Sequence, residues 1–172
     1  RRATEASRAD LLATEEARQG VILSLVGAVA NGYIALRDLD KQLDVAIQTA
    51  KSREESYKLF KLRFEGGVIS ELELNQVKSE YEQALATIPE IKKLIVFQEN
   101  ALSQLLGRNP GPISRGKSMD DLVLPSVPAG LPSDLLEKRP DIRQAEQALI
   151  AANARIGVAR AQYFPTISLT GL

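Results

Sequence analysis

The fold is decided by a turn sequence between two apolar repeats, Phe64-Glu65-Gly66-Gly67-Val68-Ile69-Ser70-Glu71-Leu72-Glu73. Two consecutive glycines can adopt the positive φ that ends a helix without a Cβ penalty. Ser70 and Glu73 then have the spacing of a capping box, in which the serine hydroxyl accepts from the third helical N–H and the glutamate accepts from the serine N–H. This stretch predicts the end of one helix and the start of the next.

Apolar residues recur three and four apart on both sides of this turn. The first series is Leu25, Val29, Gly32, Leu36, Leu39, Leu43, Ala46, Ala50, Arg53, Tyr57, Phe60 and Phe64, and the second is Leu74, Val77, Tyr81, Ala84, Ile88, Ile91, Ile95, Gln98, Leu102 and Leu105. Such spacing keeps a seam on one side of a supercoiled helix. We therefore predict a long antiparallel coiled-coil hairpin in which the numbers of facing residues sum to about 138. Examples are Tyr57 with Tyr81 and Leu43 with Ile95.

The composition excludes several classes of function. Lysine and arginine total 22, aspartate and glutamate total 22, and no block of one sign occurs, which argues against a nucleic-acid surface. The sequence has no cysteine and no histidine, so it offers no disulfides, no thiolate or histidine metal sites, and no Ser-His or Cys-His catalysis. No run of eighteen apolar residues is present, and we predict no membrane-spanning helix. We also expect no cofactor and no metal.

The fold class predicted for the chain is mainly α. We expect residues 1–107 to form the hairpin with its tip at 65–70, and residues 108–132 to form a connector rich in proline and glycine. Within the connector, Met119 to Pro125 fits a short strand or an extended segment equally well. Residues 133–163 should form a short helix from Ser133 to Lys138 and a longer one from Pro140, leading back along the rod. The alternation over residues 164–172 predicts the start of a β-strand.

Several motifs resemble those of one protein family. The most specific is the segment over residues 130–143, Gly-Leu-Pro-Ser-Asp-Leu-Leu-Glu-Lys-Arg-Pro-Asp-Ile-Arg, followed by Ala145-Glu146 and closed by Ala161-Gln162-Tyr163-Phe164-Pro165. Together with Glu99-Asn100-Ala101-Leu102 and the opening Arg1-Arg2-Ala3, it resembles TolC-like outer-membrane efflux channel proteins of the OprM type, lipoproteins of Gram-negative tripartite pumps. The likeness covers essentially the whole chain.

The resemblance implies the architecture and the location of a longer parent protein. Members of this family are homotrimers whose barrel strands lie in the outer membrane above a periplasmic tunnel of helices. This chain corresponds to the periplasmic part of the first repeat, with the barrel strands largely absent. The implied function is export of small molecules, including multidrug efflux, through a passive conduit without catalysis.

The resemblance also implies partners and a site. In the family, hairpin tips meet the periplasmic adaptor of an inner-membrane pump, and the matching residues here are Arg63, Gly66, Gly67, Val68, Ile69 and Ser70. The turn itself requires Gly66, Gly67 and Ser70, with or without a partner. An exposed Val68 contributes little to the fold, so its presence favours adaptor contact.

Two other functions compete with a channel segment. One is the α-hairpin of a periplasmic adaptor (membrane fusion) protein, although adaptors flank their hairpin with glycine-rich strands and not with a proline-rich connector and a further helix. The other is a hydrolytic enzyme, for which Asp120-Asp121 is the nearest carboxylate pair. A solvated turn explains that pair better.

Overall fold

The computed structural model describes residues 1–121, 123, 126 and 136–165. Its elements are the helices α1 (Arg2–Glu65), α2 (Glu71–Leu105) and α4 (Pro140–Ala161) and the 3-10 turn η1 (Met119–Asp121). Residues 136–138 are also helical. The prediction of a mainly α fold is confirmed. Residues 133–135 of the predicted short helix and residues 166–172 of the predicted strand lie outside the described residues.

The chain divides into two compact units, and α1 contributes to both. The first unit combines residues 1–26 with residues 125–172, and the second spans residues 27–124. The predicted boundaries after residues 107, 132 and 163 follow the sequence pattern, and they stay predictions.

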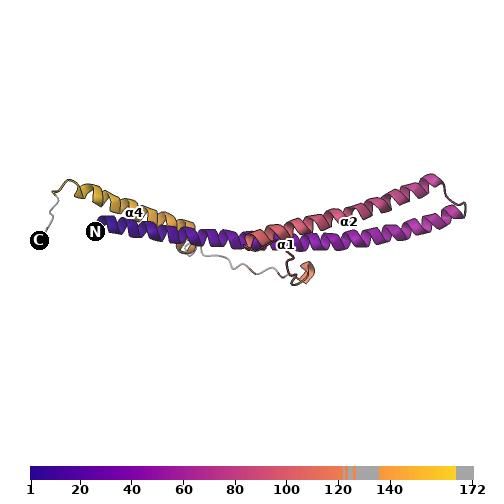
Figure 1. The fold of residues 1–172 in the computed structure, drawn as a ribbon, viewed down its shortest axis with the longest axis horizontal. Coiled ribbons are helices and arrows are strands. Elements are labelled where there is room, and N and C mark those ends of the chain that lie inside the picture. Colours follow the sequence, from indigo (N-terminus) through magenta and orange to yellow (C-terminus); the bar gives the residue numbers. More distant parts are fainter. Residues whose placement is uncertain (122, 124–125, 127–135, 166–172) are drawn as a thin grey trace. The chain divides into compact units, whose positions relative to one another are not determined.

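In the second unit, α1 and α2 run side by side from the turn that joins them (Figure 1). Their seam buries Leu36, Ile91, Ile95 and Leu102, and the flanking residues Val29, Leu39, Leu43, Ala46 and Ile113 pack against this cluster. Nearer the turn, the rings of Tyr57 and Tyr81 stack with centroids 6.0 Å apart and an interplanar angle of 9°. The antiparallel pairing and the predicted Tyr57–Tyr81 contact are therefore confirmed.

The polar residues of the seam have partners across it. Arg53 Nη1 bonds to Glu80 Oε2 at 2.5 Å. Gln98 Nε2 donates to the carbonyl oxygen of Gly32 at 2.9 Å. A Cβ at Gly32 would lie 2.9 Å from Leu102 Cδ2, so a larger residue there would displace this buried side chain. The seam thus tolerates polar residues where they can hydrogen-bond across it.

The first part of the connector lies against the hairpin. Arg115 donates to both carboxylate oxygens of Asp40, from Nε at 3.0 Å and from Nη2 at 3.2 Å, and it also donates to Glu99. Glu99 accepts a further bond from the Ile113 N–H at 3.1 Å. The Gly116 N–H donates to the Tyr33 hydroxyl at 2.8 Å. These bonds fix residues 113–116 on both helices.

The charges of this cluster stabilise one another. Hydrogen bonds to Asp40 raise the pKa of the Arg115 guanidinium above its ordinary value, with a further contribution from Glu99. Burial acts to raise the pKa of the Glu99 carboxyl, but hydrogen bonds from Arg115 and from the Ile113 N–H outweigh burial and lower it. Arg115 and Glu99 are therefore both ionised at neutral pH.

The segment that fits a strand or an extended connector forms a 3-10 turn at its start. Met119–Asp121 is η1, and the Ser118 hydroxyl donates to Asp121 Oδ2 at 2.7 Å. Residues 122, 124 and 125 of that segment lie outside the described residues. Over Met119–Asp121 the strand alternative is wrong, because a serine side chain bonded to a residue three positions on stabilises a turn.

In the first unit, α4 packs against the N-terminal part of α1 through alanines. Ala6, Ala9, Ala151 and Ala154 are buried. Two ion pairs flank them: Arg155 Nη2 lies 2.6 Å from Asp10 Oδ2, and Arg143 Nη2 lies 2.7 Å from Glu16 Oε1. Residues late in α4 thus pair with residues early in α1. The helices are antiparallel, as expected for a segment that leads back.

One window of α1 bears on the expectation that no helix spans a membrane. Within α1 an 18-residue window has a mean hydropathy of 1.6, so that by length and composition alone this helix could cross a membrane. Isolated polar residues interrupt its apolar run, which is why a search for continuous apolar residues misses it. A single such helix is weak evidence, since helices that pack against protein pass the same test.

Candidate functional site

The tip begins where glycine ends α1. The Val68 N–H donates to the carbonyl of Arg63 at 2.9 Å, and the Gly67 N–H donates to the carbonyl of Phe64 at 2.9 Å. Gly67 has a φ of 72°, whereas Gly66 keeps a negative φ. This pattern of bonds is a Schellman motif with Gly67 at its left-handed position. Only one of the two glycines therefore takes up positive φ.

A capping box starts α2 on the other side of the turn. The Glu73 N–H donates to the Ser70 hydroxyl at 3.3 Å, and the Ser70 N–H donates to Glu73 Oε2 at 2.8 Å. Ser70 has the extended backbone typical of an N-cap, with φ −80° and ψ 158°. The predicted capping box is confirmed. Both ends of the turn are held by hydrogen bonds, so its backbone conformation is well defined.

The structure brings all six predicted site residues together in this turn, and it exposes them unequally. Val68 is 75% exposed, whereas Ile69 is half-buried. The guanidinium of Arg63 lies over the Phe60 ring, 5.6 Å from its centroid. Arg63 also lies in the last turn of α1, where a cation is favoured by the helix dipole. The tip therefore exposes the apolar side chain of Val68 on a hydrogen-bonded turn, next to the guanidinium of Arg63, which the Phe60 ring holds in place.

Two exposed leucines flank the tip and were not among the predicted site residues. Leu62 is 66% exposed in the last turns of α1, and Leu72 is 67% exposed in the first turn of α2. Both lie outside the heptad series, and this is the signal that could have marked them. A leucine away from the seam at a helix end has no partner within the hairpin.

The rest of the described chain offers little for other chemistry. Among residues 1–121, 123, 126 and 136–165, no group of three or more His, Cys, Asp or Glu residues could hold a metal ion. The carboxylate of Asp120 pairs with Lys41 at 2.6 Å, and that of Asp121 accepts from Ser118. These two carboxylates therefore form contacts that hold the connector turn, as the interpretation of a solvated turn predicts.

Comparison with known proteins identifies the family. The family model described as "Outer membrane efflux protein" matches residues 1–108 and 131–172. The chain belongs to this family. The predicted recognition is confirmed, and the matched ranges leave out residues 109–130, which contain most of the connector.

Similar proteins and structures agree with this assignment. The chain is 40% identical over 97% of its length to the probable efflux pump outer membrane protein TtgC of Pseudomonas putida, and 39% identical over 97% to the cation efflux system protein CusC of Escherichia coli. The MtrE outer membrane channel of Neisseria gonorrhoeae superposes with a TM-score of 0.80 at 32% identity, over 95% of this chain and 37% of that one.

The chain spans about a third of the length of these relatives, 35% of TtgC and 37% of CusC. Family membership places it in an outer membrane efflux protein, and its helical hairpin in the periplasmic part. This disfavours the alternative of an adaptor hairpin. The names of the relatives point to different exported substances. CusC of Escherichia coli is named for cations, and a second TtgC of Pseudomonas putida is named for toluene.

Proposed function

We propose that this chain is a periplasmic tunnel segment of an outer membrane channel that exports small molecules within a tripartite pump. The segment acts as a passive wall, without catalysis and without a cofactor. Its partners are a periplasmic adaptor, an inner-membrane pump, and two further copies of the parent protein that complete a homotrimer. Family membership and the hairpin fold support the tunnel.

The adaptor-docking site in this proposal is the turn from Arg63 to Ser70. The observation that carries it is the exposure of Val68, 75%, on a backbone that the Schellman motif and the capping box hold in place. A preorganised turn loses little conformational entropy on binding. Val68 and the flanking Leu62 and Leu72 provide apolar contact area, and Arg63 provides a charge that can recognise a polar partner.

The test is Val68→Asp in the full-length parent protein. Because Val68 makes few contacts within the hairpin, the substitution should leave stability almost unchanged. Docking would place the new carboxylate against an apolar surface, so export should be abolished and crosslinking of the tip to the adaptor should be lost. Normal export together with intact tip crosslinking would show that Val68 is not a contact.

Two control variants separate contact from turn geometry. Val96→Asp changes a half-exposed valine of α2 that lies far from the tip, and it should leave crosslinking intact. Gly67→Val forces a β-branched residue into a φ of 72° and should loosen the turn itself. Hydrogen exchange at the Val68 and Glu73 amides should therefore rise in Gly67→Val and stay unchanged in Val68→Asp.

A further inference from the structure

The end of the first unit at which α1 begins and α4 ends is rich in arginine. Residues 1–10 and 150–165 contain five arginines and only two carboxylates. They are Arg1, Arg2, Arg8, Arg155 and Arg160, with Glu5 and Asp10. The whole chain is balanced, with 22 basic and 22 acidic residues. This end therefore has a local excess of positive charge, which attracts anionic partners.

Two of these arginines lie at one groove between α1 and α4. The groove has a volume of about 360 Å³, and Arg2, Asn153, Ile156, Gly157 and Arg160 are among the residues that line it. Gly157 and Arg160 are three positions apart, so they lie on the same side of α4. A Cβ at Gly157 would be 3.1 Å from Arg2 Cγ and 3.2 Å from Arg2 Cδ. The absence of a Cβ at Gly157 thus leaves room for the Arg2 side chain to lie along α4, on the side of Arg160.

Both guanidinium groups keep hydrogen-bond donors for a ligand. Arg2 donates from Nη1 to Glu5 Oε2 at 2.7 Å, and the side chains of this pair are 63% and 48% exposed. Such an exposed pair is weak, and it uses one of the two terminal nitrogens of Arg2. Within the described part of the chain, no carboxylate forms an ion pair with Arg160. A planar guanidinium can donate two parallel hydrogen bonds to a phosphate, so the two arginines together suit a phosphate group.

Two exposed aromatic residues follow directly after Arg160. Tyr163 is 89% exposed and Phe164 is 73% exposed. The Tyr163 N–H donates to the carbonyl of Arg160 and the Phe164 N–H to that of Ala161, each at 3.2 Å, so both residues continue the last turn of α4. The sequence predicts the start of a strand over residues 164–172. Aromatic side chains are enriched at the boundary between membrane and water, which is where a barrel strand would begin.

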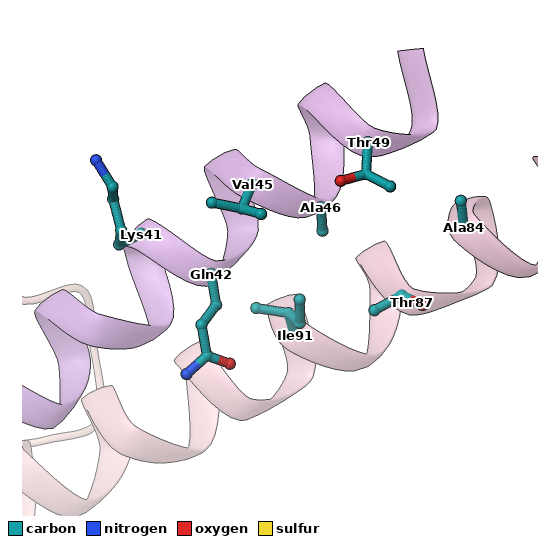
Figure 2. Close-up of a pocket in the computed structure, with 8 residues that line it drawn as sticks. All are labelled: Lys41, Gln42, Val45, Ala46, Thr49, Ala84, Thr87 and Ile91. Carbon is teal, nitrogen blue, oxygen red and sulfur yellow. The ribbon is translucent and has the colours of Figure 1, made fainter. Parts of the chain in front are cut away.

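The groove between α1 and α2 lacks this chemistry. Figure 2 shows its side chains in the space between the two helices. Lys41 is its one charged residue, and the Lys41 ammonium is paired with Asp120 at 2.6 Å. An anion there would compete with a carboxylate for a single cation. At the groove of Arg2 and Arg160, two guanidinium groups face one carboxylate, that of Glu5.

We propose that the groove at Arg2, Gly157 and Arg160 binds the headgroup phosphate of an anionic phospholipid of the outer membrane. The two guanidinium groups hold the phosphate, and the aromatic rings of Tyr163 and Phe164 lie toward the acyl chains. Arginines followed by aromatic residues and then by a strand match the order of headgroups, interface and hydrocarbon in a bilayer. The inference rests on the proposed function, in which the strand predicted after α4 enters the outer membrane.

The apolar surface beside the arginines favours a phospholipid over a free phosphate ion. Ile156 lines the groove and is 54% exposed, and Tyr163 and Phe164 are more exposed still. A phosphate ion would use the arginines alone and leave these apolar side chains in water. A phospholipid covers them with its glycerol and acyl groups, and the burial of apolar area then adds to the charge attraction.

The test measures lipid binding to the purified full-length parent protein by native mass spectrometry from detergent micelles. Phosphatidylglycerol is the probe. Arg2→Gln and Arg160→Gln each remove one guanidinium and should each lower the affinity for phosphatidylglycerol about fivefold. Arg8→Gln is the matched control, because Arg8 is exposed at the same end of α1 but on another side of the helix. It should change the affinity by less than about twofold, since a phosphate held in the groove does not meet Arg8.

Two further substitutions separate the site from a general effect of charge or folding. Glu5→Gln removes the carboxylate of the groove and should raise the affinity for phosphatidylglycerol. Gly157→Ala leaves the charge unchanged but displaces the side chain of Arg2, so it should lower the affinity. Alanine is the better helix former, so a loss of helix stability cannot explain that result. If Glu5→Gln weakens binding, or if Gly157→Ala leaves it unchanged, the proposed geometry is wrong.

Two other probes identify the ligand. Phosphatidylethanolamine carries a phosphate but no net charge and should bind more weakly than phosphatidylglycerol. Inorganic phosphate at the same concentration should not displace phosphatidylglycerol. Displacement by inorganic phosphate would mean a site for free anions, and equal losses in Arg8→Gln and Arg160→Gln would mean diffuse attraction. Either result would overturn the inference.

Failure of the proposed function is distinguishable from failure of this inference, because lipid binding does not depend on export. A parent protein that binds phosphatidylglycerol through Arg2 and Arg160 but exports nothing would contradict the proposed function alone. A parent protein that exports normally and binds the lipid equally well as Arg160→Gln would contradict the inference alone.

Discussion

The two units of the chain achieve helix packing by opposite means. The hairpin buries large side chains, and Leu36 and Leu102 are almost completely inaccessible to solvent. Among the described residues, the contact between α1 and α4 buries the four alanines Ala6, Ala9, Ala151 and Ala154. Large side chains remove much apolar area from water, whereas alanines allow close approach but bury little. The hairpin contact therefore removes more apolar area from water, and the contact between α1 and α4 is flanked by two ion pairs.

The largest expected effect comes from the core of the hairpin. Leu36→Ala removes a completely buried side chain and leaves a cavity beside Ile91 and Ile95. We expect a loss of about 2–5 kcal/mol of local stability, measured by hydrogen exchange of the α1 and α2 amides around the cluster. Leu62→Ala, which changes an exposed leucine of the same helix, is the control and should have almost no effect. Equal effects of the two substitutions would contradict the importance of the seam.

Enlarging a side chain should damage the alanine contact most. Ala151 is completely buried between α4 and α1, so Ala151→Leu forces the helices apart at a cost of about 1–3 kcal/mol. Hydrogen exchange of α4 amides should accelerate, while the hairpin amides stay protected. Ala152→Leu is the matched control, since Ala152 is exposed on the same helix. If Ala151→Leu stabilises α4, the contact has unfilled space and the comparison fails.

The ion cluster under the connector should have an intermediate effect. Arg115→Met removes the donor shared by Asp40 and Glu99 and leaves both carboxylates partly buried, which should cost about 1–2 kcal/mol. The Ile113 and Gly116 amides should then exchange faster. Lys117→Met, a neighbouring substitution at an exposed position, should leave those amides protected.

The same cluster predicts a pH dependence. The folded pKa of Glu99 lies below its unfolded value, so its contribution is complete above the ordinary glutamate pKa of about 4.3. It is lost as the pH falls through the lower folded pKa. Protection of the Ile113 amide should therefore decline below about pH 4 in the natural chain and change much less in Arg115→Met. A decline of equal size in both would remove Glu99 as the cause.

The smallest effect is expected at the edge of the alanine contact. Arg155 and Asp10 are about half-exposed, and such surface pairs contribute at most about 1 kcal/mol. Asp10→Asn should slightly accelerate exchange in α4, and raising the salt concentration should abolish the difference from the natural chain. A loss as large as that of Ala151→Leu would mean that charge, and not close packing, holds α4.

The sequence by itself determined the hairpin, its register at the tyrosine pair, the end of α1 at a glycine, the capping box that starts α2, and the start of α4 at Pro140. All of these are local or periodic, because helix caps depend on residues within a few positions and a heptad seam repeats the same information many times. The tip residues Arg63 to Ser70 could be located from the sequence for the same reason, although their contact with an adaptor stays a prediction.

Only the tertiary structure decided where the connector lies. Arg115 meets Asp40 across 75 positions of the chain, and Gly116 meets Tyr33 across 83. Residues so far apart do not belong to one sequence repeat. The proline-rich connector also has no periodic pattern from which its contacts with the helices could be predicted. The sequence pattern of a helix shows which of its side chains can be buried. Which part of its surface a distant segment then covers depends on the three-dimensional packing.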